Sequence, residues 1–430
     1  MAWPRIVNVT LGIAGAMIFM QVSGQMALEF GTPNAILASA YATMATGLLA
    51  TAFAYFAIVT GLNSNLMARG TGYGFVGAAL TSLIYASQFI VLAAIEGSII
   101  AEAIYAYVPL LPVAGLMVVI TIGNIALNWY GMKTLDTFQR YSLPVYLVLL
   151  VSAIALAWNV VPARPGNWLT AMPEGGRTGG LGLLTCMGIL NGIVGVQSVL
   201  TADYARYVRR DQLKVGALAV GFLPQLASFF VMGLVGIWFA HRFGQPNPGI
   251  YMVAVMGAWG AAYTVLSQLR INVINVYSGS LSLSNFFARI AGFAPGRVFW
   301  VVVAAALALV AMLSGVLAHI GPVLTFQGVF MFAWAASMVA DLLVVRRLGL
   351  APAHIEYRQD HLRAWNPVGT LALVAGSVVG GYLALASTNP MLVATSAFFA
   401  GAISFCVHIA LAAMTRGRYY VASTAAAART

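Results

Sequence analysis

Apolar segments long enough to cross a lipid bilayer recur along the whole of the 430-residue chain. A transmembrane helix needs about 20 consecutive, mostly apolar residues, and we find twelve such segments. Only 7% of the residues are charged and 61% are hydrophobic, whereas a soluble domain carries about 25% charged residues. The sequence therefore predicts an all-α polytopic membrane protein with 12 transmembrane helices, whose surroundings are the lipid bilayer.

The basic residues test this count of spans. With twelve spans, 17 of the 21 Lys and Arg residues fall on the side of the two termini, and Arg164, Arg177 and Arg242 fall on the other side. The positive-inside rule then places both termini in the cytoplasm, for a multi-pass protein of the plasma or inner membrane. The net charge of +11 reflects this topology, so we predict no nucleic-acid partner.

Two of the spans contain a similar glycine pattern. The first carries Gly12 and Gly15 followed by Gln21, and the sixth repeats the pattern from Gly192 to Gln197. Five is an odd number, so spans one to five and six to ten form two units of opposite orientation. Such inverted repeats bind substrate at the bilayer midplane between broken helices. We therefore expect helices one and six to be broken, while close packing through small residues is the alternative.

This plan gives the following division of the chain. Residues 1–161 form the first repeat, 181–347 the second repeat, 366–415 the last two spans and 416–430 a cytoplasmic tail. The cytoplasmic loop between the second repeat and span eleven contains His354, Glu356, Asp360 and His361. Their spacing matches no zinc site, so we expect a solvated loop.

Glu96 in span three and Arg270 in span eight are ionisable groups within the membrane. A charge at a helix centre costs at least ~2.5–3.5 kcal/mol, and such groups face a cavity or a partner. Phe89 shares a helical face with Glu96. We expect Glu96 and Arg270 to approach one another or to share the cavity. Either Glu96 is a protonatable coupling group or the two form a structural ion pair. The chain has no phosphate-binding loop and no catalytic grouping, so we predict neither an ATP-driven pump nor an enzyme.

Several stretches resemble one family of permeases. They are TADYARYVRR (201–210), ARGTGYGFVG (68–77), NVYSGSLSLSNFF (275–287), ADLLVVRR (340–347) and WNPVG (365–369). Together they resemble the nucleobase:cation symporter-1 family of purine, cytosine and hydantoin permeases. The resemblance implies the LeuT-like five-helix inverted repeat of the amino acid–polyamine–organocation superfamily. It also implies cation-coupled uptake of a nucleobase-like heterocycle by alternating access.

The resemblance also implies where the substrate and the coupling ion bind. In the family the ring stacks between aromatic residues of spans three and six, and amides bond its edge. The predicted substrate residues are Gln21, Phe89, Glu96, Asn191, Gln197, Asn272 and Asn275. The predicted ion and coupling residues are Gly12, Thr264, Ser267, Glu96 and Arg270. No tightly bound cofactor and no obligatory protein partner are implied.

The sequence departs from the family pattern at two points. No Trp, Phe or Tyr lies between Cys186 and Asp203, so the span-six stacking partner is missing. An amino-acid or amine transporter on the same fold therefore remains an alternative. Arg270 lies one turn from Ser267, where a fixed positive charge would repel a cation or replace it. This favours H⁺ over Na⁺ as the coupling ion and leaves both open.

Overall fold

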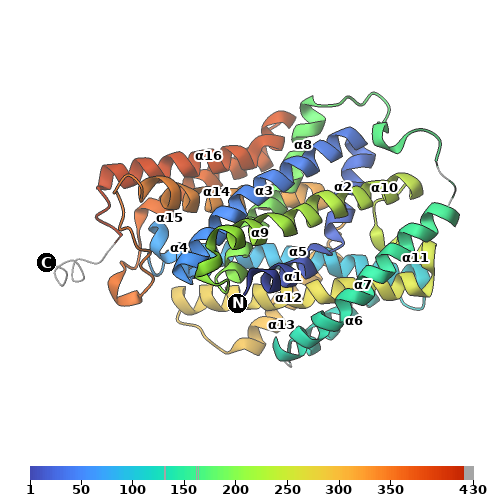
Figure 1. Ribbon diagram of the computed structural model, residues 1–430, viewed down its shortest axis with the longest axis horizontal. Helices are drawn as coiled ribbons and strands as arrows, with labels where there is room; N and C mark the ends of the chain where they lie inside the picture. The colour runs from blue at the N-terminus through green and yellow to red at the C-terminus, as the bar shows by residue number, and fades with distance from the viewer. Residues whose placement is uncertain (130–131, 161, 163, 421–430) are drawn as a thin grey trace.

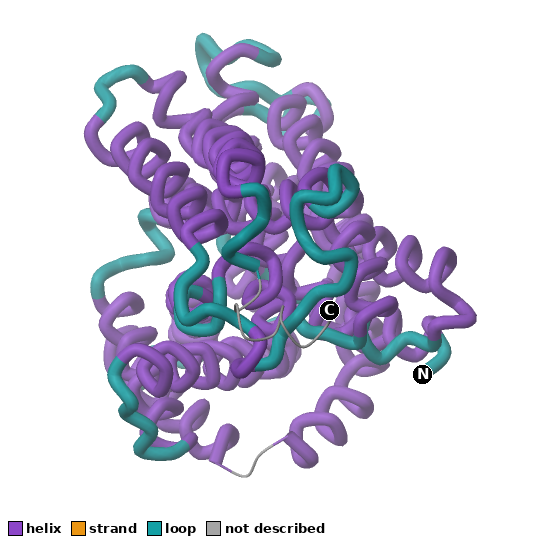
Figure 2. Tube along the Cα trace, turned by 90° about the vertical axis from the view of Figure 1, so that its left-hand side faces the viewer, coloured by secondary structure: helices purple, strands orange, loops and turns teal. Residues whose placement is uncertain are grey.

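The computed structural model describes residues 1–129, 132–160, 162 and 164–420, and all regular structure in these residues is helical (Figure 2). The long helices are α1 (Trp3–Ala14), α2 (Ile18–Phe30), α3 (Thr32–Thr60), α5 (Ala78–Tyr107), α6 (Val113–Trp129), α7 (Met132–Val160), α8 (Gly180–Ala205), α9 (Leu213–Gln225), α10 (Gly233–Phe243), α12 (Ala258–Ile290), α13 (Arg297–Leu313), α14 (Ile320–Val339), α15 (Pro367–Ala386) and α16 (Pro390–Thr415). Shorter elements are α4 (Ser64–Ala68), α11 (Pro248–Met256), the π-helical η1 (Arg69–Tyr73), η4 (Leu226–Met232) and η5 (Ala340–Val345), and the 3₁₀ turns η2 (Trp168–Thr170), η3 (Arg210–Gln212) and η6 (Gln359–His361).

Among the described residues, seven helical segments are long and apolar enough to cross a membrane. They are α3, α5, α8, the run from η3 to α10, α14 with η5, α15 and α16. The bent pair α1 and α2 passes the same test as one span. The shorter apolar helices α6 and α13, the segment Pro144–Asn159 of α7, and the more polar α12 are consistent with the remaining passes.

The two longest helices, α5 with 30 residues and α12 with 33, pack along one another. On one side of this pair lie α14, α15 and α16, and on the other side lie α6, α7 and α13 (Figure 1). Helix α8 packs against α3 and α14, and α2 packs against α10. Residues of α1 and α2 line one cavity together with residues of α5, α8 and α12, so the broken pair lies next to these three helices.

The prediction that span one is broken is confirmed. Helix α1 ends at Ala14, α2 begins at Ile18, and their axes differ by 50°. Gly15 lies at the break. A side chain does not fit at this position, because a Cβ atom would lie 2.8 Å from the Cζ atom of the Tyr146 ring.

The prediction that span six is broken is wrong, because α8 is continuous from Gly180 to Ala205. Its glycines serve close packing instead. A Cβ on Gly192 would collide with the carbonyl oxygen of Leu324 in α14, and one on Gly195 would lie 2.6 Å from the Cβ of Met331. The small-residue packing that the sequence left open is thus the role of this glycine pattern.

A buried polar cluster holds the loop that contains η1 and the segment after α16 to the helices. The carboxylate of Asp341 accepts hydrogen bonds from Arg346 Nε at 2.7 Å and from the Tyr420 hydroxyl at 2.6 Å. Arg346 also donates to the carbonyl of Gly70 at 2.6 Å, which ties η1 to the end of η5. His408 on α16 contacts the same carboxylate at 3.4 Å. The cluster joins η1, η5 and α16 to the segment that follows α16.

The loop between η5 and α15 folds on itself. Glu356 accepts hydrogen bonds from the backbone N–H groups of Tyr357 and Arg358 and pairs with His361 at 2.8 Å. The described residues contain no group of three His, Cys, Asp or Glu side chains that could hold a metal ion, and Glu356 is buried, with 8% of it exposed.

Replacing Gly192 by Ala tests the packing role of the α8 glycines. The added Cβ collides with backbone at Leu324, and overpacking of this kind costs about 1–3 kcal/mol. We expect the thermal unfolding midpoint of the purified protein to fall. Gly123→Ala on α6 is the matched control, because nothing lies within 4 Å of its Cβ, and Ala is favoured over Gly in helices. Equal midpoints for the two variants would contradict the assignment.

Candidate functional site

Side chains of α12 hold the break of span one open. The hydroxyl of Ser267 donates to the carbonyl of Gly15 at 3.3 Å, and the Oε1 atom of Gln268 accepts from the N–H of Met17 at 3.0 Å. Both backbone groups lack helical partners because the helix is interrupted there. Buried backbone groups need such partners, so α12 compensates for the hydrogen bonds that the unwound turn has lost.

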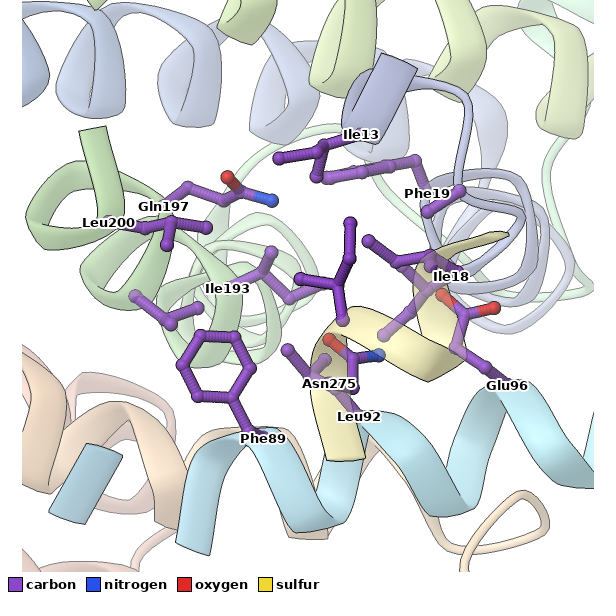
Figure 3. A pocket seen from close by; sticks show the side chains of 14 residues that line it. Ile13, Ile18, Phe19, Phe89, Leu92, Glu96, Ile193, Gln197, Leu200 and Asn275 are labelled. Atoms are coloured by element: carbon purple, nitrogen blue, oxygen red, sulfur yellow. The ribbon is translucent and has the colours of Figure 1, made fainter. Parts of the chain in front are cut away.

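A small cavity lies beside the break, between α1, α2, α5, α8 and α12 (Figure 3). The volume of this cavity is about 20 Å³, which is enough for about one water molecule. The polar side chains of its wall are those of Glu96, Gln197 and Asn275. The rest of the wall is apolar and consists of Ile13, Ala16, Ile18, Phe19, Phe89, Leu92, Ile193, Val196, Leu200, Ile271 and Ile274.

Glu96 is the ionisable side chain of this wall, and only 1% of it is exposed. Its carboxylate interacts with the backbone N–H of Ile18, the first residue of α2. The first N–H groups of a helix lack intrahelical partners and carry partial positive charge, which stabilises an anion there. The second oxygen, Oε2, is buried without a hydrogen-bond partner. Oε2 is therefore an acceptor of this carboxylate that no side chain or backbone group satisfies.

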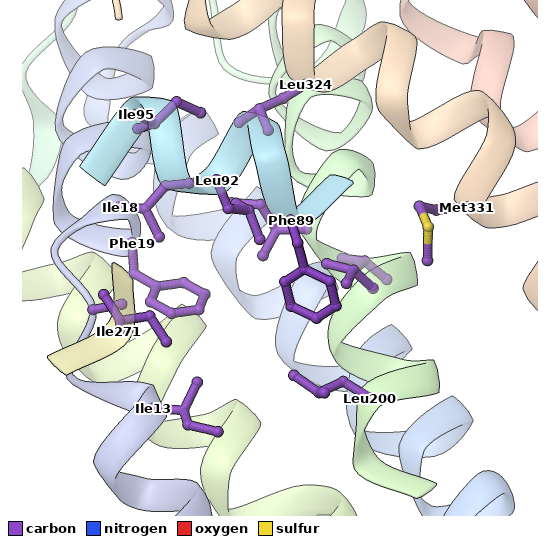
Figure 4. Close-up of a cluster of buried hydrophobic side chains, with 14 of the residues drawn as sticks. Ile13, Ile18, Phe19, Phe89, Leu92, Ile95, Leu200, Ile271, Leu324 and Met331 are labelled. Carbon is purple, nitrogen blue, oxygen red and sulfur yellow. The ribbon is translucent and has the colours of Figure 1, made fainter. Parts of the chain in front are cut away.

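Two phenyl rings contribute to the cavity wall from different helices, as Figures 3 and 4 show. Phe89 on α5 is supported by an edge-on contact with Tyr85 at 4.7 Å between ring centroids, and Phe19 on α2 is supported by Phe229 at 5.1 Å. The ring of Phe19 was not among the predicted site residues. Its position directly after the glycine-weakened turn was the signal that the sequence offered.

The aspartate of the sequence motif DYARY has a structural role at the end of α8. Asp203 accepts hydrogen bonds from the Ser64 N–H at 2.9 Å, the Ser64 hydroxyl at 2.7 Å and the Tyr85 hydroxyl at 3.1 Å. It thereby fixes α4 and α5 to α8. Since Tyr85 also packs on Phe89, this network positions one ring of the cavity.

The predicted substrate residues separate into two groups. Phe89, Glu96, Gln197 and Asn275 meet at the cavity, although they come from three different helices. The other three, Gln21, Asn191 and Asn272, are buried but do not line it. Asn191 accepts a hydrogen bond from Tyr41 at 2.7 Å, which joins α8 to α3. Substrate binding by all seven residues stays a prediction.

The predicted coupling residues lie around the break but are already engaged. Thr264 donates to the carbonyl of Gly260 in its own helix at 3.0 Å, while Ser267 is bonded to Gly15. Gly12 lies in α1, one turn before the break. Arg270 packs over the ring of Tyr146, with 5.7 Å between its Cζ atom and the ring centroid. It does not line the cavity, and the ion pairs of the described residues do not join it to Glu96.

A second, smaller cavity of about 10 Å³ lies between α1, α8, α9 and η4. Ile13, Gln197 and Leu200 line both cavities and therefore separate them. Thr10, Tyr204 and Gln225 line the far side. The two cavities lie in sequence along α8, from its middle toward the end that carries Asp203.

Several solved structures share this fold, although no known family model and no curated protein matches the chain. The inward-facing conformation of Mhp1 is 17% identical, with 95% of this chain and 90% of that chain covered and a TM-score of 0.73. Mhp1 is described as a nucleobase-cation-symport-1 family transporter. Its closed conformation with bromovinylhydantoin bound is 20% identical, with 95% and 92% covered and a TM-score of 0.66.

More distant structures are also similar along their whole length. A manganese transporter from Eremococcus coleocola is 15% identical, with 97% of this chain and 96% of that chain covered and a TM-score of 0.57. A Na⁺-coupled sialic acid symporter is 11% identical, with 95% and 98% covered and a TM-score of 0.53.

These likenesses establish the class of fold. The chain is an all-α polytopic membrane protein with the five-helix inverted-repeat architecture of secondary transporters. More particularly, it has the fold of Mhp1, a transporter of the family that the sequence motifs resemble. These similar proteins are named as transporters of different solutes, so the shared fold does not identify the substrate of this chain.

Replacing Gln268 by Leu tests how the break is held. The N–H of Met17 would lose its acceptor, and an unsatisfied buried group costs about 1–3 kcal/mol. We expect a lower thermal unfolding midpoint together with weaker ligand binding. Gln25→Leu is the control, because Gln25 bonds Glu29 at an exposed position and should change stability by less than about 0.5 kcal/mol. An unchanged midpoint in Gln268→Leu would show that the break does not depend on this bond.

Proposed function

We propose that this protein is a cation-coupled secondary transporter that takes up a nucleobase-like heterocycle by alternating access. The observation that carries the proposal is the cavity at the break of span one, where Phe19, Phe89, Glu96, Gln197 and Asn275 meet. Ring faces on an apolar wall suit a flat heterocycle. A few polar groups at defined places suit hydrogen bonds along its edge.

The small volume of the cavity fits transport better than permanent binding. Room for about one water molecule is too small for a heterocycle, so the surrounding helices must separate to admit one. Alternating access proceeds by movement of one helix unit against another around a central site. The higher TM-score to the inward-facing state of Mhp1 than to its closed state supports opening toward the side of the second cavity.

The alternative is an amino-acid or amine transporter on the same fold. One observation favours it: α8 lines the cavity with Ile193, Val196, Gln197 and Leu200 and contributes no aromatic ring. A substrate without a ring would not need one. The rings of Phe19 and Phe89 favour the heterocycle, because they supply aromatic surface from α2 and α5 instead.

The proposed topology has both termini in the cytoplasm, following the distribution of basic residues. The proposed substrate is a small molecule, and the lipid bilayer is the surrounding partner. The side from which the second cavity opens is then cytoplasmic, because the DYARY motif and its arginines end α8 there.

For the coupling ion we favour H⁺. The Ser267 hydroxyl is engaged with Gly15, and Arg270 lies one turn away with its charge over Tyr146. A fixed cation near these oxygens opposes the binding of Na⁺. Glu96 is the ionisable group lining the cavity, and buried carboxyl groups at such places are candidates for proton transfer.

Uptake into proteoliposomes tests the proposed function. We expect labelled cytosine or adenine to accumulate against its gradient, while labelled leucine and alanine do not. An inwardly directed H⁺ gradient should increase the initial rate several-fold, and a Na⁺ gradient at constant pH should not. Accumulation of the amino acids alone would establish the alternative. The absence of uptake for every heterocycle would reject the proposal.

Glu96→Gln tests the proton-coupling role. The amide cannot exchange a proton, so we expect uptake by this variant to lose its dependence on external pH and on the H⁺ gradient. Gln197→Glu is a matched control, because it keeps Glu96 while placing a second carboxyl group on the same wall. A pH profile of correctly folded Glu96→Gln that follows the wild type would end the proton-carrier hypothesis.

A further inference from the structure

Two arginines lie over one phenyl ring at the end of α12. The Cζ atom of Arg69, in η1, is 4.9 Å from the centroid of the Phe75 ring. The Cζ atom of Arg289, in the last turn of α12, is 5.3 Å from the same centroid. An aromatic face attracts a cation, so the ring brings two guanidinium groups close together. Their positive charges repel one another.

These two charges have no ion-pair partner in the described part of the chain. The ion pairs found there involve neither Arg69 nor Arg289. One donor atom of each side chain, Arg69 Nε and Arg289 Nη1, is buried and bonds to no acceptor of the described residues. A buried donor without an acceptor is costly, and more so when it carries charge. An anion with several acceptor oxygens would satisfy both donors and relieve the repulsion.

The backbone fixes the position of the ring. The N–H of Phe75 donates to the carbonyl of Arg363 at 3.0 Å. Gly74, which precedes it, has a φ of 79°, and a Cβ atom there would lie 2.7 Å from the same carbonyl oxygen. Arg69 is held from its other side, because its Nη1 atom donates to the carbonyl of Tyr357 at 3.4 Å. The two arginines are therefore positioned before any ligand binds, which lowers the cost of binding one.

An exposed apolar surface begins next to Arg289. Ile290 follows it directly, and Phe293 and Phe299 pack edge-on at 5.6 Å between ring centroids where the chain passes into α13. These three side chains are exposed, and so is Leu281, which lies two turns before Arg289 on about the same face of α12. In a membrane protein such a surface contacts lipid. Arg289 therefore lies where apolar helix surface meets charged side chains, as at the level of the lipid headgroups.

From this arrangement we propose that Arg69 and Arg289 bind the phosphate group of an anionic phospholipid whose acyl chains lie along the apolar surface of α12 and α13. A guanidinium group presents a planar fork of donors that matches phosphate oxygens. Basic pockets between transmembrane helices bind anionic headgroups in this way. The bound phosphate links η1 to α12. The lipid is a resident ligand and not the transported solute, so the inference does not depend on the proposed function.

Lipid binding to the purified full-length protein in detergent tests the proposal. Phosphatidylglycerol and phosphatidylcholine with identical acyl chains are titrated separately, and native mass spectrometry counts the lipids bound. We expect phosphatidylglycerol to bind at least about tenfold more tightly, because the choline group of the other lipid places a positive charge beside its phosphate. Millimolar inorganic phosphate should not displace phosphatidylglycerol, since it gains nothing from the apolar surface. These comparisons use the unmodified chain, so they do not depend on a variant folding.

Three variants separate this site from a general attraction by net charge. Arg69→Gln and Arg289→Gln each remove one guanidinium group, and each should weaken phosphatidylglycerol binding at least about tenfold. Arg5→Gln is the matched control. It removes the same charge from an exposed position on α1, which packs against α8 and α9, and it should change binding by less than about threefold. A thermal unfolding midpoint close to that of the wild type shows that each variant is folded.

The outcomes decide the assignment. Equal binding of the two lipids by the wild type would overturn it. Displacement of phosphatidylglycerol by inorganic phosphate would also overturn it, because the site would then take a soluble anion. Losses of similar size in Arg289→Gln and Arg5→Gln would reduce the effect to net charge and end the proposal. A preference for phosphatidylglycerol that resists phosphate, is lost in Arg69→Gln and Arg289→Gln and is kept in Arg5→Gln would establish the lipid site.

Discussion

The structure depends on one interruption of backbone hydrogen bonding, the turn from Gly15 to Met17 in the middle of span one. In a hydrocarbon environment every unpaired N–H and C=O group is costly, so an unwound turn persists only where protein groups bond to it. Ser267 and Gln268 supply a donor and an acceptor from α12, and Glu96 interacts with the first N–H group of α2. Ser267 and Gln268 thus supply two of the hydrogen bonds that the missing turn of helix would have made.

The same turn explains how distant parts of the chain are held together. Residues of α12 lie about 250 positions from their bonding partners in span one, so the two repeats contact each other through the break. The ring of Tyr146 in α7 packs against Gly15 from another side, and the guanidinium group of Arg270 lies over the same ring. A displacement of α12 or α7 would therefore shift the backbone of the turn beside the cavity.

The sequence was informative about fold class and less so about local geometry. Hydropathy and basic residues predicted the membrane architecture, and the pattern around Gly15 located the break, because bilayer thickness and helix propensity act locally. The equivalent pattern at Gly192 and Gly195 was misread. A glycine either weakens its helix or lets a neighbouring element approach closely, and the packing around it decides which. At these two glycines the backbone of α14 packs closely against α8. Phe89, Glu96, Gln197 and Asn275 line one cavity, while their role in substrate binding stays a prediction. Phe19 is not among the predicted residues, because the one signal for it in an apolar span is its place directly after the glycine-weakened turn.

The two small cavities along α8 bear on how the membrane stays sealed. Ile13, Gln197 and Leu200 are the residues common to both, and two of these three are aliphatic. Each space has room for about one water molecule, which is less than the hydration shell of any ion. Hydrophobic constrictions of this kind exclude ions by dewetting. Movement of these few side chains alone would join two spaces that hold about one water molecule each, which is too little for a continuous column of water and for the leak of ions that such a column would carry.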